Sequence, residues 1–181
     1  MFDKFEIGSY DSEDFRTGNL PAEFLEDSNF SDCLFTGRKF ENQLFYGYYC
    51  CNSDFKETTF LNCHITKINC DYNNYSNAYF ENTRFLRVEL YNAVFKGAYF
   101  KNVSFIACYI NNTTDFSNCI FDNVELKSTA LDGSIFHNVT VKEISVEKKF
   151  ADSINIGSTE TPHILYGDEA YNWLTRYEKH I

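Results

Sequence analysis

The sequence predicts an all-β coil with four sides, and three observations lead to this fold class. Large apolar residues recur at every fifth position over much of the 181-residue chain. A smaller residue comes two positions before most of them, as with Ala93 before Phe95. The two prolines, Pro21 and Pro162, lie outside the repeating part, so neither interrupts a continuous ladder of strands.

The five-residue period is unbroken from residue 30 to residue 110. All seventeen of its positions are hydrophobic, in a chain that is 44% hydrophobic. Chance would give this result roughly once in a million before allowing for the five phases. The positions are Phe30, Phe35, Phe40, Phe45, Cys50, Phe55, Phe60, Ile65, Cys70, Tyr75, Phe80, Phe85, Leu90, Phe95, Phe100, Phe105 and Ile110.

A step of five residues does not suit an ordinary helix or a flat strand. On an α-helix it turns the side chain by roughly 140°, and on a strand it alternates faces. A chain that bends by about a right angle every five residues turns each large residue, and the small one before it, inward. Four sides then close a coil, and coils stack at about 4.8 Å. Side chains twenty residues apart, such as Phe60 and Phe80, should therefore lie above one another.

Two consecutive five-residue units show the pattern most clearly, residues 93–97 (Ala-Val-Phe-Lys-Gly) and 98–102 (Ala-Tyr-Phe-Lys-Asn). They resemble the pentapeptide-repeat family, in which a small residue, Asp or Asn, Leu or Phe, a polar residue and Gly or Asn follow one another. Only the second place departs from that pattern. The resemblance covers residues 30–141 and implies a right-handed quadrilateral β-helix. Some members of the family bind type II topoisomerases by imitating the shape and charge of DNA.

Three segments are predicted in order along the chain. Residues 1–27 carry a net charge of −6 and are predicted to form an acidic N-terminal cap, because a solenoid end needs a polar cover. Residues 28–147 are predicted to form the β-helix, of about six coils at the ladder spacing. Its regular ladder is expected to begin near Cys50, since Arg38 and Gln43 replace small residues before that point. One residue inserted between Ile110 and Phe116 predicts a bulge in that side.

Residues 148–181 abandon the period. Residues 157–162 are predicted to form a loop, and a helix is predicted from Gly167. Helical spacing places five residues on one face of it: Ala170, Trp173, Leu174, Tyr177 and Ile181. Two interpretations remain for this face, a lid over the last coil and a contact in a homodimer.

The cysteines suggest a reducing compartment, and the absence of long apolar runs argues against a membrane protein. Six of the seven cysteines occupy inward positions and are expected to be free thiols, while Cys51 points outward and should be the thiol most open to reagents. No apolar run approaches the roughly 20 residues that span a membrane. The first residues also lack the features of a signal peptide. We therefore expect a cytoplasmic protein without a membrane partner.

No catalytic constellation is visible in the sequence. Its four histidines are scattered, no C-x-x-C pair occurs, and no glycine-rich phosphate loop is present. We expect no enzyme, no metal and no cofactor. The outward residues offer a different candidate, an apolar stripe that predicts a protein interface. Its members are Tyr79, Tyr99 and Ile120 in one column, with Leu86 and Ile106 around the next corner.

The charge leaves two functions open. A net charge of −10 disfavours direct nucleic-acid binding. Residues 28–147 carry 13 acidic and 10 basic residues, a net charge of −3. A DNA mimic of about 29 Å should show near 17 negative charges. The sequence therefore predicts a non-enzymatic scaffold that binds a protein partner or a second copy of itself. The alternative is a DNA mimic that modulates a type II topoisomerase or another DNA-binding protein.

Overall fold

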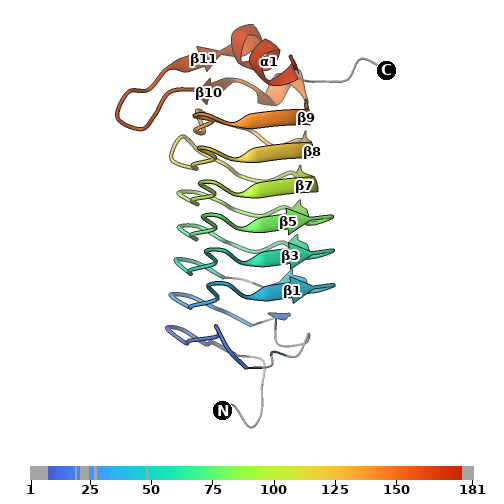
Figure 1. The fold of residues 1–181 in the computed structure, drawn as a ribbon, viewed down its shortest axis with the longest axis vertical. Coiled ribbons are helices and arrows are strands. Elements are labelled where there is room, and N and C mark those ends of the chain that lie inside the picture. Colours follow the sequence, from blue (N-terminus) through green and yellow to red (C-terminus); the bar gives the residue numbers. More distant parts are fainter. Residues whose placement is uncertain (1–7, 19, 21–24, 27, 48, 177–181) are drawn as a thin grey trace.

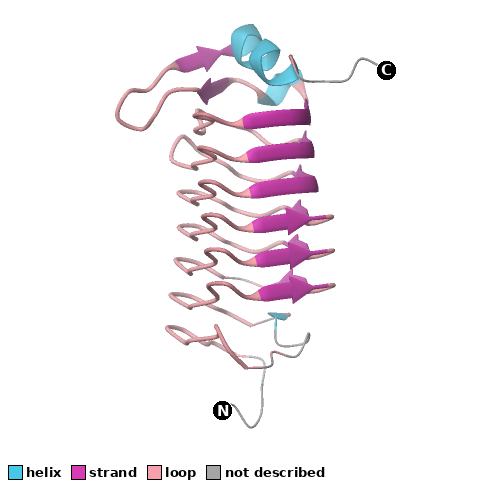
Figure 2. Ribbon diagram, in the orientation of Figure 1, coloured by secondary structure: helices cyan, strands magenta, loops and turns pink. Residues whose placement is uncertain are grey.

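The chain is a stack of coils that ends in a hairpin and a helix (Figure 1). A computed structural model describes residues 8–18, 20, 25–26, 28–47 and 49–176. Strands follow one another up the stack, and turns connect them on the other sides (Figure 2). The one α-helix in the described residues, α1 (Gly167–Thr175), lies across the C-terminal end.

Two sides of the coil carry the named strands. Nine strands form one sheet: β1 (Lys39–Glu41), β2 (Leu44–Tyr46), β3 (Thr59–Leu61), β4 (His64–Thr66), β5 (Tyr79–Glu81), β6 (Arg84–Leu86), β7 (Tyr99–Ile106), β8 (Ile120–Lys127) and β9 (Thr140–Val146). Strands β1, β3 and β5 stack on one side and β2, β4 and β6 on the next, all in parallel. Strand β7 pairs with both β5 and β6, so it runs around the corner between the two sides. Strand β8 pairs with β7 over the same two sides.

The other two sides are held by single parallel bridges between coils. One series joins Tyr49, Asn69, Glu89, Tyr109 and Ala130, and another joins Leu34, Asp54, Asn74, Val94, Asp115 and Ile135. Four sides with parallel pairing confirm the predicted quadrilateral β-helix.

Phenylalanine columns fill the axis, which explains the five-residue period. The ring centroids of Phe60 and Phe80 lie 4.8 Å apart, and those of Phe35 and Phe55 lie 4.7 Å apart. Residues two places earlier, such as Ala78 and Val88, are also buried. Stacked rings gain about 0.5–1.5 kcal/mol per pair beyond the burial of their area.

Asparagine marks the corner between the two stranded sides. Asn62, Asn82 and Asn102 have φ between 51° and 53°, a left-handed conformation that Asn tolerates better than most residues. Their side chains form a ladder, in which Asn82 Nδ2 donates to Asn62 Oδ1 at 3.1 Å and Asn102 Nδ2 donates to Asn82 Oδ1 at 3.1 Å. The corner residues thus support both the turn and the stacking of coils.

The ladder extends further toward the N-terminus than the sequence predicted. Asp14 pairs with Leu34, and the buried ring of Phe15 stacks on Phe35 at 5.2 Å. This described part of the predicted cap is therefore a further coil of the β-helix. The expected start near Cys50 is also wrong, because β1 is already in register. Arg38 does not disturb that register, since its guanidinium leaves the interior and donates to the carbonyls of Phe15 and Gly18.

The extra residue after Ile110 lies in a corner, so the predicted bulge in a side is wrong. A turn forms in which Thr114 N donates to Asn111 O at 3.0 Å. Thr114 is buried, and its hydroxyl donates to the carbonyl of Leu90 at 2.8 Å. In an equivalent corner, Tyr72 N donates to the carbonyl of Tyr91 in the next coil at 2.9 Å. At the insertion, Asn92 N donates to Asn111 Oδ1 at 3.3 Å instead, so a side chain replaces the backbone acceptor. A register shift occurs instead between β8 and β9, at residues 121–124.

The C-terminal segment closes the stack. After η2 (Lys148–Phe150), strands β10 (Ser153–Asn155) and β11 (Ile164–Tyr166) pair antiparallel. Asn155 also bridges to Ile135, which carries the ladder beyond the predicted boundary at residue 147. No helix within the described ranges is long and apolar enough to cross a membrane.

Helix α1 packs on the last coil as a lid. Ala170 and Leu174 are fully buried and belong to the core. Trp173 is half-buried, with its ring 6.4 Å from that of Phe136. Ala170 and Leu174 are therefore not available for a dimer contact, which corrects that interpretation of the helix face. Tyr177 and Ile181 lie outside the described residues.

Candidate interaction surfaces

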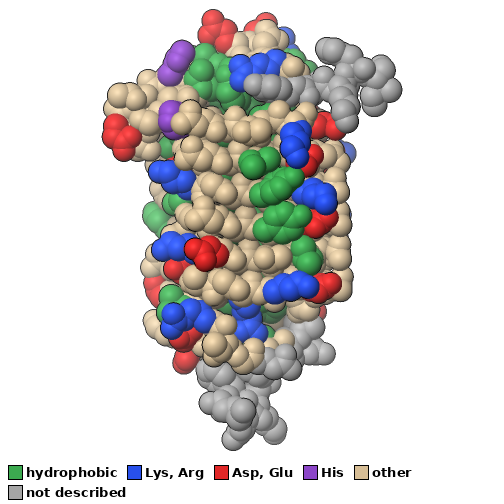
Figure 3. All heavy atoms as spheres, in the orientation of Figure 1, with side chains coloured by type: hydrophobic (Ala, Val, Ile, Leu, Met, Phe, Trp, Pro, Cys, Tyr) green, Lys and Arg blue, Asp and Glu red, His purple; other side chains and the backbone are tan. Residues whose placement is uncertain are grey.

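The predicted stripe lies on the stranded sides, where its members are only half exposed. Tyr79, Tyr99 and Ile120 stand on β5, β7 and β8. Leu86 and Ile106 end β6 and β7 on the adjoining side. Figure 3 shows a green column over β5, β7 and β8 with acidic and basic side chains alongside it.

The tyrosine hydroxyls of the stripe already form hydrogen bonds within the chain. The Tyr79 hydroxyl donates to Glu81 Oε2 at 2.8 Å, and Lys101 pairs with Glu81 at 2.7 Å. The hydrogen bond from Lys101, followed by that from Tyr79, lowers the pKa of Glu81.

The same arrangement recurs further along the stripe. The Tyr99 hydroxyl donates to Asp122 Oδ2 at 2.8 Å, and Lys142 reaches the same oxygen at 2.8 Å. The stripe is thus a lattice of rings and ion pairs that satisfies itself, so it offers a partner few unused groups.

The more exposed aromatic residues lie on another side of the coil. Tyr49, Tyr72 and Tyr109 are 55%, 61% and 56% exposed. They flank the inward column that contains Cys50, Cys70, Leu90 and Ile110, which forms one of the bridged sides. The five-residue period concerns the inward residues, so it does not predict these tyrosines. The signal was present, because Tyr49, Asn69, Glu89 and Tyr109 are spaced by twenty residues.

Acidic residues share this side with the tyrosines. We call it the tyrosine–acid face and define it by Tyr49, Tyr72, Tyr91, Tyr109, Asp11, Asp32, Asp71, Glu89 and Asp132. The described residues that make up this side contain no Lys or Arg; they are residues 9–12, 29–32, 49–52, 69–72, 89–92, 109–112 and 130–133. The adjoining side carries basic residues together with a few acids; Lys67, Arg84, Arg87, Lys127 and Glu125 all lie on it. Lys67 and Arg87 stand at its edge, where they line a shallow pocket with Tyr49 and Glu89. The tyrosine–acid face is therefore acidic, with basic residues along one border.

Hydrogen bonds hold the central acids of the tyrosine–acid face in place. Asp71 Oδ1 accepts from the backbone N of Tyr91 at 2.8 Å, and Glu89 Oε2 accepts from Asn69 Nδ2 at 2.8 Å. The pKa of Tyr91 is raised by burial first and by the nearby Glu89 and Asp71 second. Tyr91 therefore stays protonated in the neutral pH range.

Cys51 lies on the same side and is less accessible than the sequence suggested. It is half-buried, and its Sγ donates to Asn69 Oδ1 at 3.0 Å. Burial raises its pKa to about 11. Cys51 is still the most accessible of the seven thiols, as predicted, because the other six are buried. All seven cysteines are free thiols.

In the part of the chain that the structure describes, no group of three or more His, Cys, Asp or Glu side chains is placed to hold a metal ion.

Comparisons with known proteins agree with this geometry. The model of the family "Pentapeptide repeats" matches residues 76–112 in eight copies. Residues 76–112 therefore carry pentapeptide repeats, and they lie in the coil that the family resemblance implied. No curated protein matches its sequence.

Solved structures of pentapeptide coils resemble it at low sequence identity. A trypsin-treated variant of QnrB1, a plasmid-mediated fluoroquinolone resistance protein, is 20% identical, with a TM-score of 0.52, over 78% of this chain and 68% of that one. Full-length QnrB1 is 13% identical, with a TM-score of 0.38, over 78% of this chain and 80% of that one. HetL, from the cyanobacterium Nostoc, is 11% identical, with a TM-score of 0.26, over 76% of this chain and 65% of that one. At 20% identity, the likeness to the QnrB1 variant shows the fold alone.

Proposed function

We propose that the protein is a non-enzymatic scaffold that binds a protein partner through its tyrosine–acid face. One observation carries the proposal: three tyrosines more than half exposed stand among five carboxylates on a side without a described Lys or Arg. Tyrosine is enriched at interfaces because it offers a large contact area, a hydroxyl and few rotatable bonds. A cluster of negatively charged carboxylates favours a partner with a positively charged surface.

The partner class that fits is a protein with a basic surface. Hydrogen bonds fix Asp71 and Glu89, and the ladder fixes the backbone of every coil, so binding orders little of this face. Exposed carboxylates gain only modest energy each, so the tyrosines should supply most of the affinity. The carboxylates should set the association rate and its dependence on salt.

Affinity capture from the source cells tests the proposal. The test variant combines Tyr49→Ser, Tyr72→Asn and Tyr109→Ser, with Asn at residue 72 because its φ is 60°. The control is Tyr46→Ser, which removes a tyrosine that is 37% exposed on the adjoining side. We expect a basic protein that binds the wild type and the control, and at least tenfold less of it on the triple variant. If the triple variant captured the partner equally well and had an unchanged circular dichroism spectrum, the proposal that this face binds the partner would be rejected.

A second candidate is a DNA mimic that modulates a type II topoisomerase. It is favoured by the carboxylates of the tyrosine–acid face and by the likeness to a fluoroquinolone resistance protein. Five carboxylates are few beside the one charge per about 1.7 Å that a duplex carries. A supercoiling assay with DNA gyrase decides. If micromolar protein neither inhibits the enzyme nor protects it, this candidate is eliminated.

A further inference from the structure

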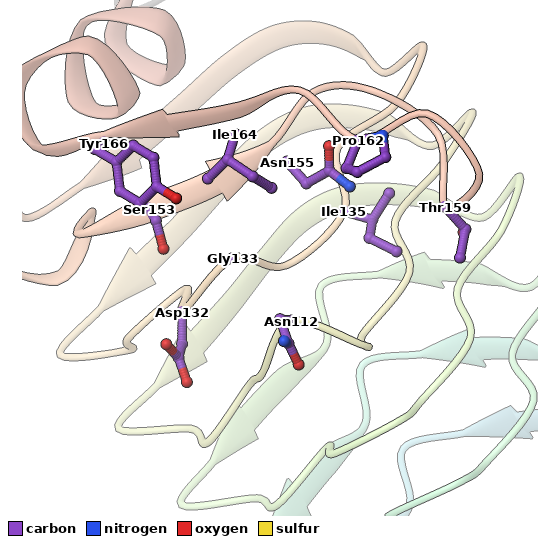
Figure 4. A pocket seen from close by; sticks show the side chains of 10 residues that line it. All are labelled: Asn112, Asp132, Gly133, Ile135, Ser153, Asn155, Thr159, Pro162, Ile164 and Tyr166. Carbon is purple, nitrogen blue, oxygen red and sulfur yellow. The ribbon is translucent and has the colours of Figure 1, made fainter.

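We propose that a hollow at the C-terminal end of the tyrosine–acid face binds an arginine side chain of the partner. This inference rests on the proposed function and names the residue type that anchors the complex. The hollow measures about 370 Å³ and lies between the β10–β11 hairpin and the corner turns of the last coils (Figure 4). It lies beside the face rather than apart from it, since Asp132 belongs to both.

The floor of the hollow is open because Gly133 has no side chain. Its φ of 74° places it in the left-handed region. A Cβ there would approach Asn112 Cβ to 3.1 Å and Ser153 Oγ to 3.7 Å. Any larger residue would fill the space between the last two corners, so glycine at this position keeps the hollow available.

The hairpin that forms the opposite wall is held rigidly. Asn155 is buried, and its Oδ1 accepts from the backbone N of Gly157 and of His163, both at 2.9 Å. Ser153 and Tyr166 are paired across the two strands. The wall is therefore formed before a ligand arrives, which lowers the entropy that binding must overcome.

The groups on the rim suit a guanidinium. Tyr166 is 66% exposed, and the exposed Asp132 makes no ion pair with any described residue. No Lys or Arg lines the hollow, while Ile135, Ile164 and Pro162 supply an apolar wall. A guanidinium stacks on a tyrosine ring and pairs with a carboxylate in two parallel hydrogen bonds. Its methylene stem can lie along the apolar wall.

A nuclear magnetic resonance titration with N-acetyl-arginine amide tests the hollow without any partner. We expect saturable shifts of the backbone amides of Gly133, Ser153 and Tyr166. The uncharged isostere N-acetyl-citrulline amide should bind at least tenfold more weakly, because it cannot form the ion pair. Equal responses to the two compounds, or shifts confined to other parts of the chain, would overturn the proposal.

Two matched variants locate the charge that matters. Asp132→Asn should weaken arginine binding at least tenfold. Glu125→Gln makes the same change of charge on an exposed residue of another side, and it should leave binding unchanged. Arginine binding that survives Asp132→Asn would reject the anchor.

The proposal for the hollow and the proposal for the tyrosine–acid face can be rejected independently of each other. The triple tyrosine variant leaves the hollow intact, so it should still bind arginine amide while it loses the partner. A partner captured equally by wild type and Asp132→Asn would reject the anchor and leave the face standing. Loss of arginine amide binding from the triple variant would show that the response arises elsewhere and would overturn the hollow.

Discussion

Corner asparagines show how single residues stabilise this coil. Asn82 combines a φ of 51° with one hydrogen bond to Asn62 and one from Asn102. The sequence showed that Asn recurs beside the large residues, and a turn role could be predicted from its tolerance of left-handed backbone.

Replacing Asn82 should separate its two contributions. Asn82→Ala should lower the free energy of unfolding by about 1–2 kcal/mol for the left-handed backbone alone, with a further loss from the broken ladder. Asn82→Gly should cost less, because glycine adopts that backbone freely. Urea denaturation measures both. The explanation would be wrong if the alanine variant were as stable as the wild type.

Thiol titration gives a second prediction about residues. Burial raises the pKa of Cys51 from 9.0 to about 11, so its thiolate fraction at pH 8 falls about a hundredfold. Thiol reagents should modify it slowly in the native protein and quickly in urea, with Cys51→Ser identifying its share. Equal modification rates in native and unfolded protein at pH 8 would contradict this. Burial likewise raises the pKa of Cys33 to about 11.

The folded pKa values of Cys51 and Cys33 both exceed 9.0. The stability that these thiols contribute is therefore complete below pH 9 and is lost as the pH rises through 11.

What could be predicted for a residue depended on whether it faces inward. Phe80 and Phe100 were placed correctly, because the period has only one geometric solution that buries all its large residues. Tyr72 and Tyr109 escaped prediction because outward residues obey no packing rule and differ from coil to coil. Arg38 was misjudged because its long side chain can leave a tight corner and bond to carbonyls outside it.

Helix α1 shows what the sequence could decide about an element. Its apolar face was visible in the spacing of Ala170, Trp173 and Leu174, but spacing alone cannot say what covers such a face. The structure decides this, since the last coil exposes an open core end and α1 fills it. A covering element of this kind is required wherever a solenoid ends.

The lid role predicts the effect of mutations in α1. Leu174→Ala should cost about 2–5 kcal/mol, because the side chain is fully buried. Trp173→Ala should lower the melting temperature and leave the molecular mass in solution unchanged. Light scattering and thermal denaturation measure the two effects, with the exposed Asn172→Ala as the control. A halved mass without loss of stability would favour the dimer contact instead.

For the molecule as a whole, the stack of coils makes each side a separate surface. The tyrosine–acid face, the adjoining side with its basic residues and the stripe of rings and ion pairs all use one backbone geometry. Net charge hides this distribution, so the small negative charge of the repeat could not reveal the acidic side. The twenty-residue register shows it once outward residues are assigned to sides.

The central claim is that the tyrosine–acid face contacts the partner. Hydroxyl-radical footprinting of the purified complex, read by mass spectrometry, tests it most directly, because every exposed tyrosine reports on its own side. We predict that oxidation of Tyr49, Tyr72 and Tyr109 falls severalfold when the partner binds, while that of Tyr46 on the adjoining side is unchanged. Protection of Tyr46 with no change at those three tyrosines would contradict the claim.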